Sequence, residues 1–422
     1  KKFGPDGKPL YMILRKNLYG HPAAGRQFGQ QRDATLISKF NDYELGWSCK
    51  STRMDPCLFL ITRDYLEVKQ WVLLLVHVDD CDIVGTTQQI IDDVMAVCKQ
   101  IWDCKVVDPE YMLGVRRRVI RDEATGVVQT LEIDMIAFVE GMYKSFEDRM
   151  GGRSGELPVE DGLHLSMIEQ VPPEESRAVL DAGYQCAVGM LLWAARRVYT
   201  ACRIGISMLC RVMSKPSWKA FYAAMSMIRW IYERRYKGIM FTDGVCPIPL
   251  GLVDASNKAD PKDGKCQFGY LFFWMGAPII ELSKKLRHIG LSSEHNEYMA
   301  LHFAHQALIW LRQLLTELGL YDLVDRPTVV LEDNKPAIIL SQEDIVTQGN
   351  QYMYIPYHYN KEVQEAGYSS VMWVPSALNI ADMMTKCNGV KEFRALLGAL
   401  TGYDTALLER LFLYAYSGAS LD

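Results

Sequence analysis

The stretch Trp71–Gly85 constrains the fold of this chain more than any other. The apolar run Val72–Val76 is typical of a buried strand, and it stops at the adjacent acids Asp79 and Asp80 before apolar residues resume. This pattern predicts a hairpin whose turn carries two acids. Burying carboxylates costs free energy unless a cation neutralises them, and Mg²⁺ prefers carboxylate oxygens. The alternative is an ordinary turn, because aspartate is a favoured turn residue.

The totals indicate an intracellular globular protein. A length of 422 residues is enough for two or three domains, and 49% hydrophobic with 23% charged residues is typical of packed cores. We find neither a signal-peptide pattern nor an uninterrupted apolar run of the ~18 residues that a membrane span needs. The 11 cysteines form no Cys-x-x-Cys pair, so we expect reduced thiols and no zinc site.

A basic stretch lies between residues 196 and 237, although the formal net charge of the whole chain is −5. It contains many Lys and Arg residues, beginning with Arg196 and Arg197, against the single acid Glu233. Aromatic residues such as Trp193 and Trp218 are interleaved with them. Basic and aromatic side chains together favour nucleic-acid binding. A solvated helix face is the alternative.

An α/β pattern begins after Cys246. Residues 248–254 alternate as a strand that ends in Asp254, and residues 267–275 and 278–282 continue as antiparallel strands. Ser292 and Ser293 offer an N-cap for a helix that Gly319 can close. Glu297 falls on the apolar stripe of that helix, which is an unusual place for a carboxylate.

A fourth strand at residues 328–333 ends in Asp333, a fifth lies at 369–374, and a last short helix carries Asp382. Four acids, Asp254, Glu297, Asp333 and Asp382, can therefore converge at one edge of a mixed sheet. This order of elements is that of the ribonuclease H fold, so the predicted fold class is α/β (α+β).

Several motifs extend this interpretation. They are His77-Val78-Asp79-Asp80, the segment Leu18–Phe28, the segment Ser292–Tyr298, and Ala381–Lys386. With these motifs the chain resembles the reverse transcriptase–ribonuclease H region of copia-type LTR-retrotransposon Pol polyproteins, from about Leu10 to Lys386.

The resemblance implies four parts. Residues 1–150 would be a partial reverse-transcriptase palm, in which Tyr111–Val115 is a strand that grips the primer. Residues 151–245 would be a linker with a helical thumb/connection region. Residues 246–388 would be a ribonuclease H-like domain, and residues 389–422 a helical tail that packs on this domain or on a partner.

The resemblance also implies an activity: hydrolysis of the RNA strand of RNA/DNA hybrids. Two Mg²⁺ ions, replaceable by Mn²⁺, would be held by Asp254 as the bridging ligand together with Glu297, Asp333 and Asp382. In the palm, Asp79 and Asp80 would be the metal ligands of an RNA-directed DNA polymerase. The expected nucleic-acid contacts are Arg26, Gly114, Arg196, Arg197, Lys284 and Lys285.

In copia elements the first catalytic aspartate of the polymerase lies upstream of the point where this chain begins, so we expect no polymerisation by this chain alone. The substitutions at Pro22, Ala23, His77, Arg203 and Tyr352 depart from the family pattern. Two alternatives stay open: a decayed remnant that folds or binds nucleic acid without turnover, and a piece of a longer polyprotein with polymerase activity. The expected location is the cytoplasm, a virus-like particle or the nucleus, with no membrane association.

Overall fold

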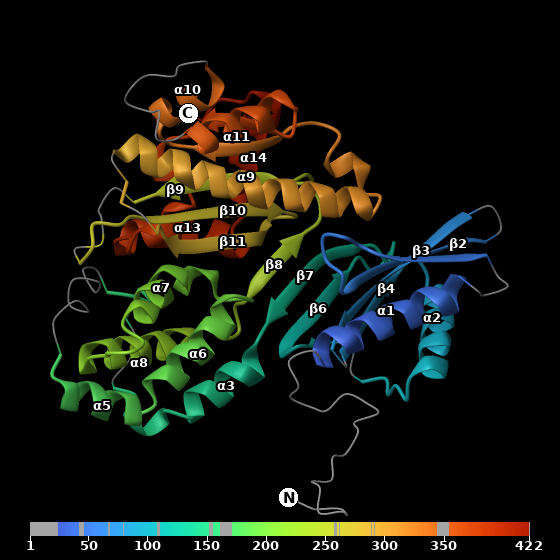
Figure 1. Cartoon of the computed structure of the whole chain (residues 1–422), viewed down its shortest axis with the longest axis horizontal. Helices are drawn as coiled ribbons and strands as arrows, with labels where there is room; N and C mark the ends of the chain where they lie inside the picture. The colour runs from blue at the N-terminus through green and yellow to red at the C-terminus, as the bar shows by residue number, and fades with distance from the viewer. Residues whose placement is uncertain are drawn as a thin grey trace, which may run out of the picture. The chain divides into compact units, whose positions relative to one another are not determined.

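The computed structural model describes residues 24–41, 46–65, 68–78, 80–107, 110–151, 155–160, 171–256, 260, 262–287, 289–290, 292–343 and 354–421. The chain divides into two compact units, Lys1–Pro109 and Glu110–Asp422 (Figure 1). This division does not coincide with the expected boundary after residue 150. The finer boundaries after residues 245 and 388 stay predictions.

The first unit is a four-stranded antiparallel sheet with two helices. The strands are β1 (Trp47–Ser51), β2 (Leu58–Tyr65), β3 (Val68–His77) and β4 (Asp80–Gly85), paired in chain order. Helices α1 (Ala24–Asn41) and α2 (Gln88–Ile101) supply buried side chains to its core. The predicted hairpin at residues 71–85 is thus present, and Val78 adopts a positive φ of 56° in its turn.

The second unit opens with another antiparallel sheet. It pairs β5 (Tyr111–Met112), β6 (Val115–Arg121), β7 (Val128–Asp134) and β8 (Ile239–Thr242) in chain order. The expectation of one strand over Tyr111–Val115 is wrong, because Leu113 and Gly114 turn the chain between β5 and β6 with φ of 52° and 79°.

The helical region between β7 and β8 agrees with the sequence pattern. It contains α3 (Ile136–Lys144), α5 (Pro173–Asp181), α6 (Tyr184–Ala195), α7 (Arg203–Arg211) and α8 (Trp218–Glu233). Their apolar faces share one hydrophobic core with part of the sheet that follows. The ion pair between Arg203 on α7 and Glu281 in that sheet, at 2.5 Å, joins the two regions.

A five-stranded mixed sheet forms the rest of the second unit. Its order is β11-β10-β9-β12-β13, with bounds β9 (Leu250–Ala255), β10 (Gln267–Trp274), β11 (Ala277–Lys285), β12 (Thr328–Glu332) and β13 (Ser369–Trp373). Strand β10 is antiparallel to both of its neighbours, β11 and β9, whereas β9, β12 and β13 run parallel to one another. This is the ribonuclease H-like arrangement expected from the sequence, and the predicted α/β class is confirmed.

Helices cover both faces of this sheet (Figure 1). On one face lies α9 (Ser293–Glu317), which Ser292 caps through His295 N at 3.0 Å. Near it are α10 (Lys335–Gln342) and α11 (Tyr354–Glu365). The opposite face packs against α7 and the short helix α12 (Asp382–Thr385).

The C-terminal tail packs on the ribonuclease H-like sheet. It forms α13 (Val390–Thr401) and α14 (Ala406–Ser417), whose buried leucines join the core on the α12 face. The hydroxyl of Tyr416 donates to Pro249 O at 2.6 Å and accepts from Val329 N at 2.9 Å. The tail therefore joins two strands of the sheet through one side chain.

Among the described helices, none is by itself long and apolar enough to cross a membrane. The adjoining helices α5 and α6 reach that length and apolar content only as a pair, with a 58° bend between them. All 11 cysteines are free thiols.

Candidate active site

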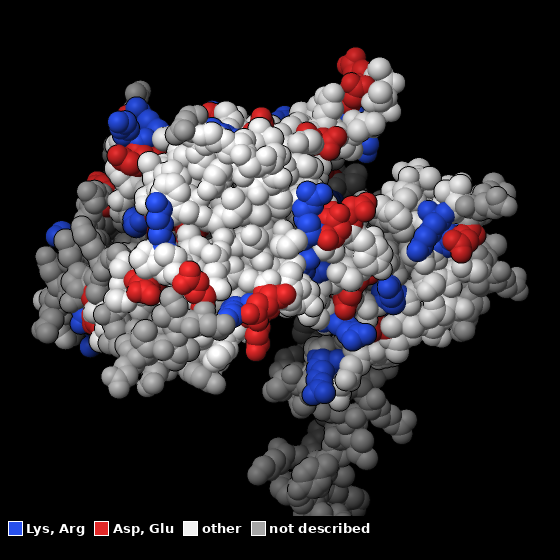
Figure 2. All heavy atoms as spheres, turned by 90° about the horizontal axis from the view of Figure 1, so that it is seen from above, with Lys and Arg blue, Asp and Glu red and all other residues white. Residues whose placement is uncertain are grey.

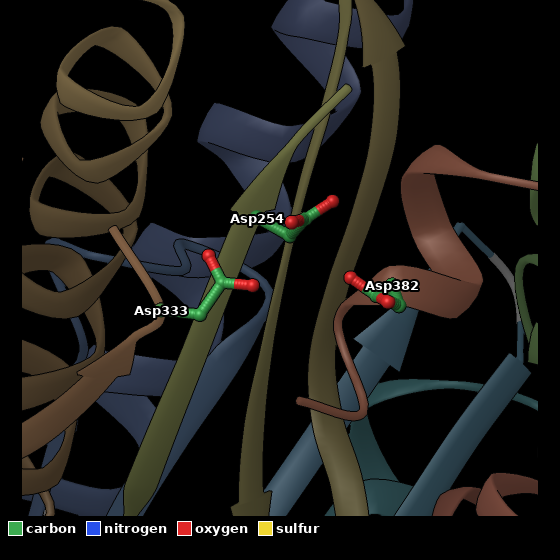
Figure 3. A group of neighbouring side chains, drawn as sticks. All are labelled: Asp254, Asp333 and Asp382. Carbon is green, nitrogen blue, oxygen red and sulfur yellow. The ribbon is translucent and has the colours of Figure 1, made fainter. Parts of the chain in front are cut away.

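Three of the predicted acids lie together at one end of the mixed sheet. Asp254 is on β9, Asp333 follows β12, and Asp382 begins α12. Their carboxylates point toward one another (Figure 3), and one oxygen of each lies within 4.8 Å of the others. Such a set of oxygens can hold a divalent cation.

Local features of the sequence place these aspartates. Gly269 pairs with Asp254 across β10 and β9, and a Cβ at this glycine would lie 2.3 Å from the Cβ of Met384. The missing side chain allows α12 to approach the sheet. The buried amide of Asn379 donates to Val253 O at 2.9 Å and accepts from Ala381 N at 3.1 Å, which fixes the start of α12 beside β9.

Thr385 and Lys386 complete the surroundings of Asp254. The Thr385 hydroxyl donates to one oxygen of Asp254. The Lys386 ammonium lies 3.2 Å from the other oxygen and 2.7 Å from Asp382 Oδ1. Both residues belong to the Ala381–Lys386 motif, but their contacts with the aspartates were not predicted from the sequence.

The fourth predicted acid, Glu297, lies in the second turn of α9 and is 4% exposed. It is grouped with Asp333 and with Glu332, the last residue of β12. Sequence reasoning missed Glu332. The signal that could have identified it is an acid at the end of a strand that is buried at every position.

The site gathers more buried carboxylates than positively charged side chains. Burial, with the neighbouring carboxylates of Glu332 and Asp254, raises the pKa of Glu297 to about 11. Burial and the nearby Asp254 raise the pKa of Asp382 to about 7, and burial also raises the pKa of Asp333. Glu297 Oε2 and Glu332 Oε2 are buried without a hydrogen-bond partner. Buried unpaired oxygens of this kind fit the ligand set of a hard cation.

The two acids of the expected palm, Asp79 and Asp80, give less support to a metal site. Asp79 lies outside the described residues. Asp80 pairs with His77 at the start of β4 and is exposed, so the expectation of a buried acidic turn is wrong for Asp80. The loss of hydration that would demand a cation is absent at an exposed carboxylate.

The predicted nucleic-acid contacts are dispersed over both units. Arg26, Arg196 and Lys284 are exposed, and Gly114 lies in the turn between β5 and β6. The guanidinium carbon of Arg197 lies over the Trp193 ring, 3.2 Å from its centroid. Figure 2 shows charged side chains in small groups of both signs, without one continuous basic field on the face in view. These contacts stay predictions.

Lys285 differs from the other predicted contacts because it is engaged within the fold. Its ammonium lies 2.7 Å from Asp260 and 2.8 Å from Asp263. A phosphate would have to compete with these ion pairs, which makes Lys285 a weaker candidate than the exposed Lys284.

Sequence comparison places the chain among transposon proteins. It is 26% identical over 385 residues to the retrovirus-related Pol polyprotein from transposon TNT 1-94 of Nicotiana tabacum, covering 90% of this chain and 27% of that protein. It is 24% identical over 383 residues to the one from transposon RE1 of Arabidopsis thaliana, covering 90% and 24%. The chain is a homologue of copia-type Pol polyproteins. It spans about a quarter of the length of these Pol polyproteins.

Other comparisons add less to the Pol assignment. Secreted RxLR effector protein 161 of Plasmopara viticola is 32% identical over 130 residues, which cover 30% of this chain and 90% of that protein. Its name specifies no reaction. No family model matches the chain.

Among solved structures, a ribonuclease H1 isolated from compost gives a TM-score of 0.27 at 16% identity, covering 36% of this chain and 99% of that chain. The ribonuclease H1 from Halobacterium salinarum gives 0.25 at 16% identity, covering 32% and 93%. Such scores carry no weight for the fold, which follows from the strand order and directions.

Proposed function

We propose that this chain is a reverse transcriptase–ribonuclease H region of a copia-type Pol polyprotein, and that its mixed-sheet domain hydrolyses the RNA strand of RNA/DNA hybrids. The observation that carries the proposal is the meeting of Asp254, Asp333 and Asp382, from three separate elements, at one end of the sheet. The homology to Pol polyproteins is consistent with it.

The reaction would need divalent cations, with Mg²⁺ as the expected ion and Mn²⁺ as a substitute. Such ions activate a water molecule and stabilise the departing 3′ oxygen. Asp254, Glu297, Asp333 and Asp382 would hold them. Thr385 fixes the orientation of the Asp254 carboxylate by its hydrogen bond, and Lys386 offsets part of the negative charge.

The substrate class follows from the chemistry of the hybrid. A requirement for a 2′-hydroxyl and for an A-like duplex shape would select the RNA strand. Exposed cations on the second unit, Arg196 and Lys284 among them, would contact phosphates. Their removal should raise the hybrid concentration needed for half-maximal rate without changing the chemistry at the aspartates.

Polymerase activity is proposed to be absent from this polypeptide on its own. Among the described residues, Asp80 belongs to no group of three or more ligating side chains. Two-metal phosphoryl transfer needs carboxylates on both sides of the metal pair. Extension of a primed template by the purified polypeptide would refute this part.

The test is cleavage of a labelled RNA/DNA hybrid by the purified chain in the presence of Mg²⁺. Asp254→Asn keeps the size of the side chain and removes its charge, so it should abolish cleavage. The exposed Asp243 provides a matched control, and Asp243→Asn should cleave normally. Cleavage retained by Asp254→Asn would remove the site assignment. A folded wild-type chain that cleaves with neither Mg²⁺ nor Mn²⁺ would favour the decayed remnant.

A further inference from the structure

The main chain at Asp333 is held by a side chain of the neighbouring strand. Asp333 lies one residue beyond the end of β12, and the parallel pairing of β12 with β13 stops at Glu332 and Trp373. Among the described residues, the ladder therefore offers no further rung to the Asp333 carbonyl. This carbonyl accepts a hydrogen bond from the Trp373 indole instead, with 3.1 Å between Trp373 Nε1 and Asp333 O. The indole thus takes the place of a backbone donor.

The peptide group between Trp373 and Val374 is hydrogen-bonded on both sides. Its N–H donates to Glu332 O at 3.0 Å. Its C=O points the opposite way, because the peptide is trans, and accepts from the Tyr414 hydroxyl at 2.7 Å. Tyr414 belongs to α14, and β13 is the edge strand of the sheet. The C-terminal helix therefore binds the sheet edge at the residue that holds Asp333.

A second contact orients the Trp373 ring. The ammonium of Lys335, at the start of α10, lies 4.3 Å from the ring centroid. A cation over the face of an indole is attracted by the negative potential of that face. Trp373 is 38% exposed, so core packing alone does not fix its ring. The polar contacts determine where the indole N–H points.

We propose that Trp373 is a positioning residue for Asp333, and that helix α14 sets its position through Tyr414. The hydrogen bonds form a series from the Tyr414 hydroxyl through Trp373 to the Asp333 carbonyl. Because Asp333 is one of the aspartates proposed to hold the cations, the role of Trp373 rests on the proposed nuclease site. The C-terminal tail would then contribute to cleavage without touching the hybrid.

The experiment removes single hydrogen-bonding groups from this series in the full chain. Loss of a group that orients a metal ligand typically lowers metal affinity or activity by roughly 10- to 100-fold. Trp373→Phe keeps an aromatic ring without the N–H, so kcat for hybrid cleavage should fall about tenfold with KM unchanged, and Mn²⁺ should bind the metal-stripped chain about tenfold more weakly. Tyr414→Phe acts one hydrogen bond further away and should lower both quantities about threefold.

Two matched controls separate positioning from a loss of stability. Trp274→Phe removes an indole hydrogen bond of the same kind, to Pro247 O at 3.0 Å, near the end of the sheet opposite the aspartates. Tyr416→Phe removes the hydroxyl that bonds Val329 N and Pro249 O from the same helix α14. Both controls should lower the free energy of unfolding. At a temperature where every variant is folded, both should keep the wild-type kcat and Mn²⁺ affinity.

The outcomes for Trp373 and for the nuclease proposal are distinguishable. If the wild type cleaves and Trp373→Phe has the kcat and Mn²⁺ affinity of Trp274→Phe, the role of Trp373 is refuted alone. If the wild type binds Mn²⁺ without cleaving the hybrid, the nuclease proposal is refuted alone, and the Mn²⁺ affinities decide on Trp373. A wild type that binds no Mn²⁺ overturns both.

The part of the tail has its own test. Tyr414→Phe with the kcat and Mn²⁺ affinity of Tyr416→Phe would refute the link through α14. If Trp373→Phe does not fold, Tyr414→Phe replaces it as the test of the whole series, with the same control and the same refuting result.

Discussion

Replacing Lys386 with methionine should make the site bind divalent cations more tightly. The ammonium lies 3.2 Å from Asp254 Oδ1 and 2.7 Å from Asp382 Oδ1, on two carboxylates that a cation would use. Because the side chain is 40% exposed, solvent screens these contacts, and their joint value is about 1 kcal/mol rather than the ~1.5–3 kcal/mol of a buried charged hydrogen bond.

The same free energy links stability and affinity. A cation that takes these oxygens must displace the ammonium, and it loses the ~1 kcal/mol that the contacts contribute. Lys386→Met never has those contacts, so it should be less stable than the wild type without metal by about 1 kcal/mol and should bind Mn²⁺ roughly fivefold more tightly.

Calorimetric titration with Mn²⁺ and urea unfolding in a chelator measure the two quantities. Lys391→Met, on the exposed surface of α13, is the control and should alter neither. The reasoning fails if Lys386→Met binds Mn²⁺ more weakly than the wild type, because Lys386 would then assist cation binding rather than compete with it.

Three further predictions concern the framework of the second unit. Arg203→Met leaves the nearly buried Glu281 carboxylate without its partner, and should lower the free energy of unfolding by about 3 kcal/mol, measured by urea unfolding. The double variant Arg203→Met with Glu281→Gln should recover most of this loss. A loss below about 1 kcal/mol in Arg203→Met would contradict the prediction. Burial lowers the pKa of His305 to about 4, so this histidine binds a proton more weakly in the folded chain than in the unfolded chain. The free energy of unfolding should therefore fall as the pH drops from about 6.5 toward 4, by about 2 kcal/mol at pH 5. His305→Gln should remove this part of the pH dependence, and identical profiles for the two proteins would refute it. Tyr416→Phe removes two hydrogen bonds of the tail and should cost about 1–2 kcal/mol, read from the midpoint of thermal unfolding.

The sequence predicted the mixed sheet well because its signals are local. Strands β9, β10, β12 and β13 end near an acid or a turn residue, and the N-cap at Ser292 marks the start of α9. The positions of Asp254, Asp333 and Asp382 followed from strand and helix ends. They could be expected at one edge without knowledge of any contact.

The parts that were missed depend on non-local geometry. Glu332 could not be assigned to the site from the sequence, because adjacent residues of a strand point to opposite faces and Asp333 was already assigned there. Asp333 lies beyond the end of β12, so its carboxylate can lie close to that of Glu332. The contacts of Lys386 depend on how closely α12 approaches β10. The exposure of Asp80 depends on what covers the hairpin, which an apolar strand pattern does not encode.

The docked tail affects how a minimal fragment with the candidate active site should be cut from this chain. A fragment ending at residue 388, where the sequence suggests a domain limit, would leave the leucines of the sheet uncovered and Val329 N without the Tyr416 oxygen. Such a fragment would be expected to aggregate, and its inactivity would say nothing of the aspartates. Shortened versions intended for crystallisation or assay should therefore extend at least to Ser417.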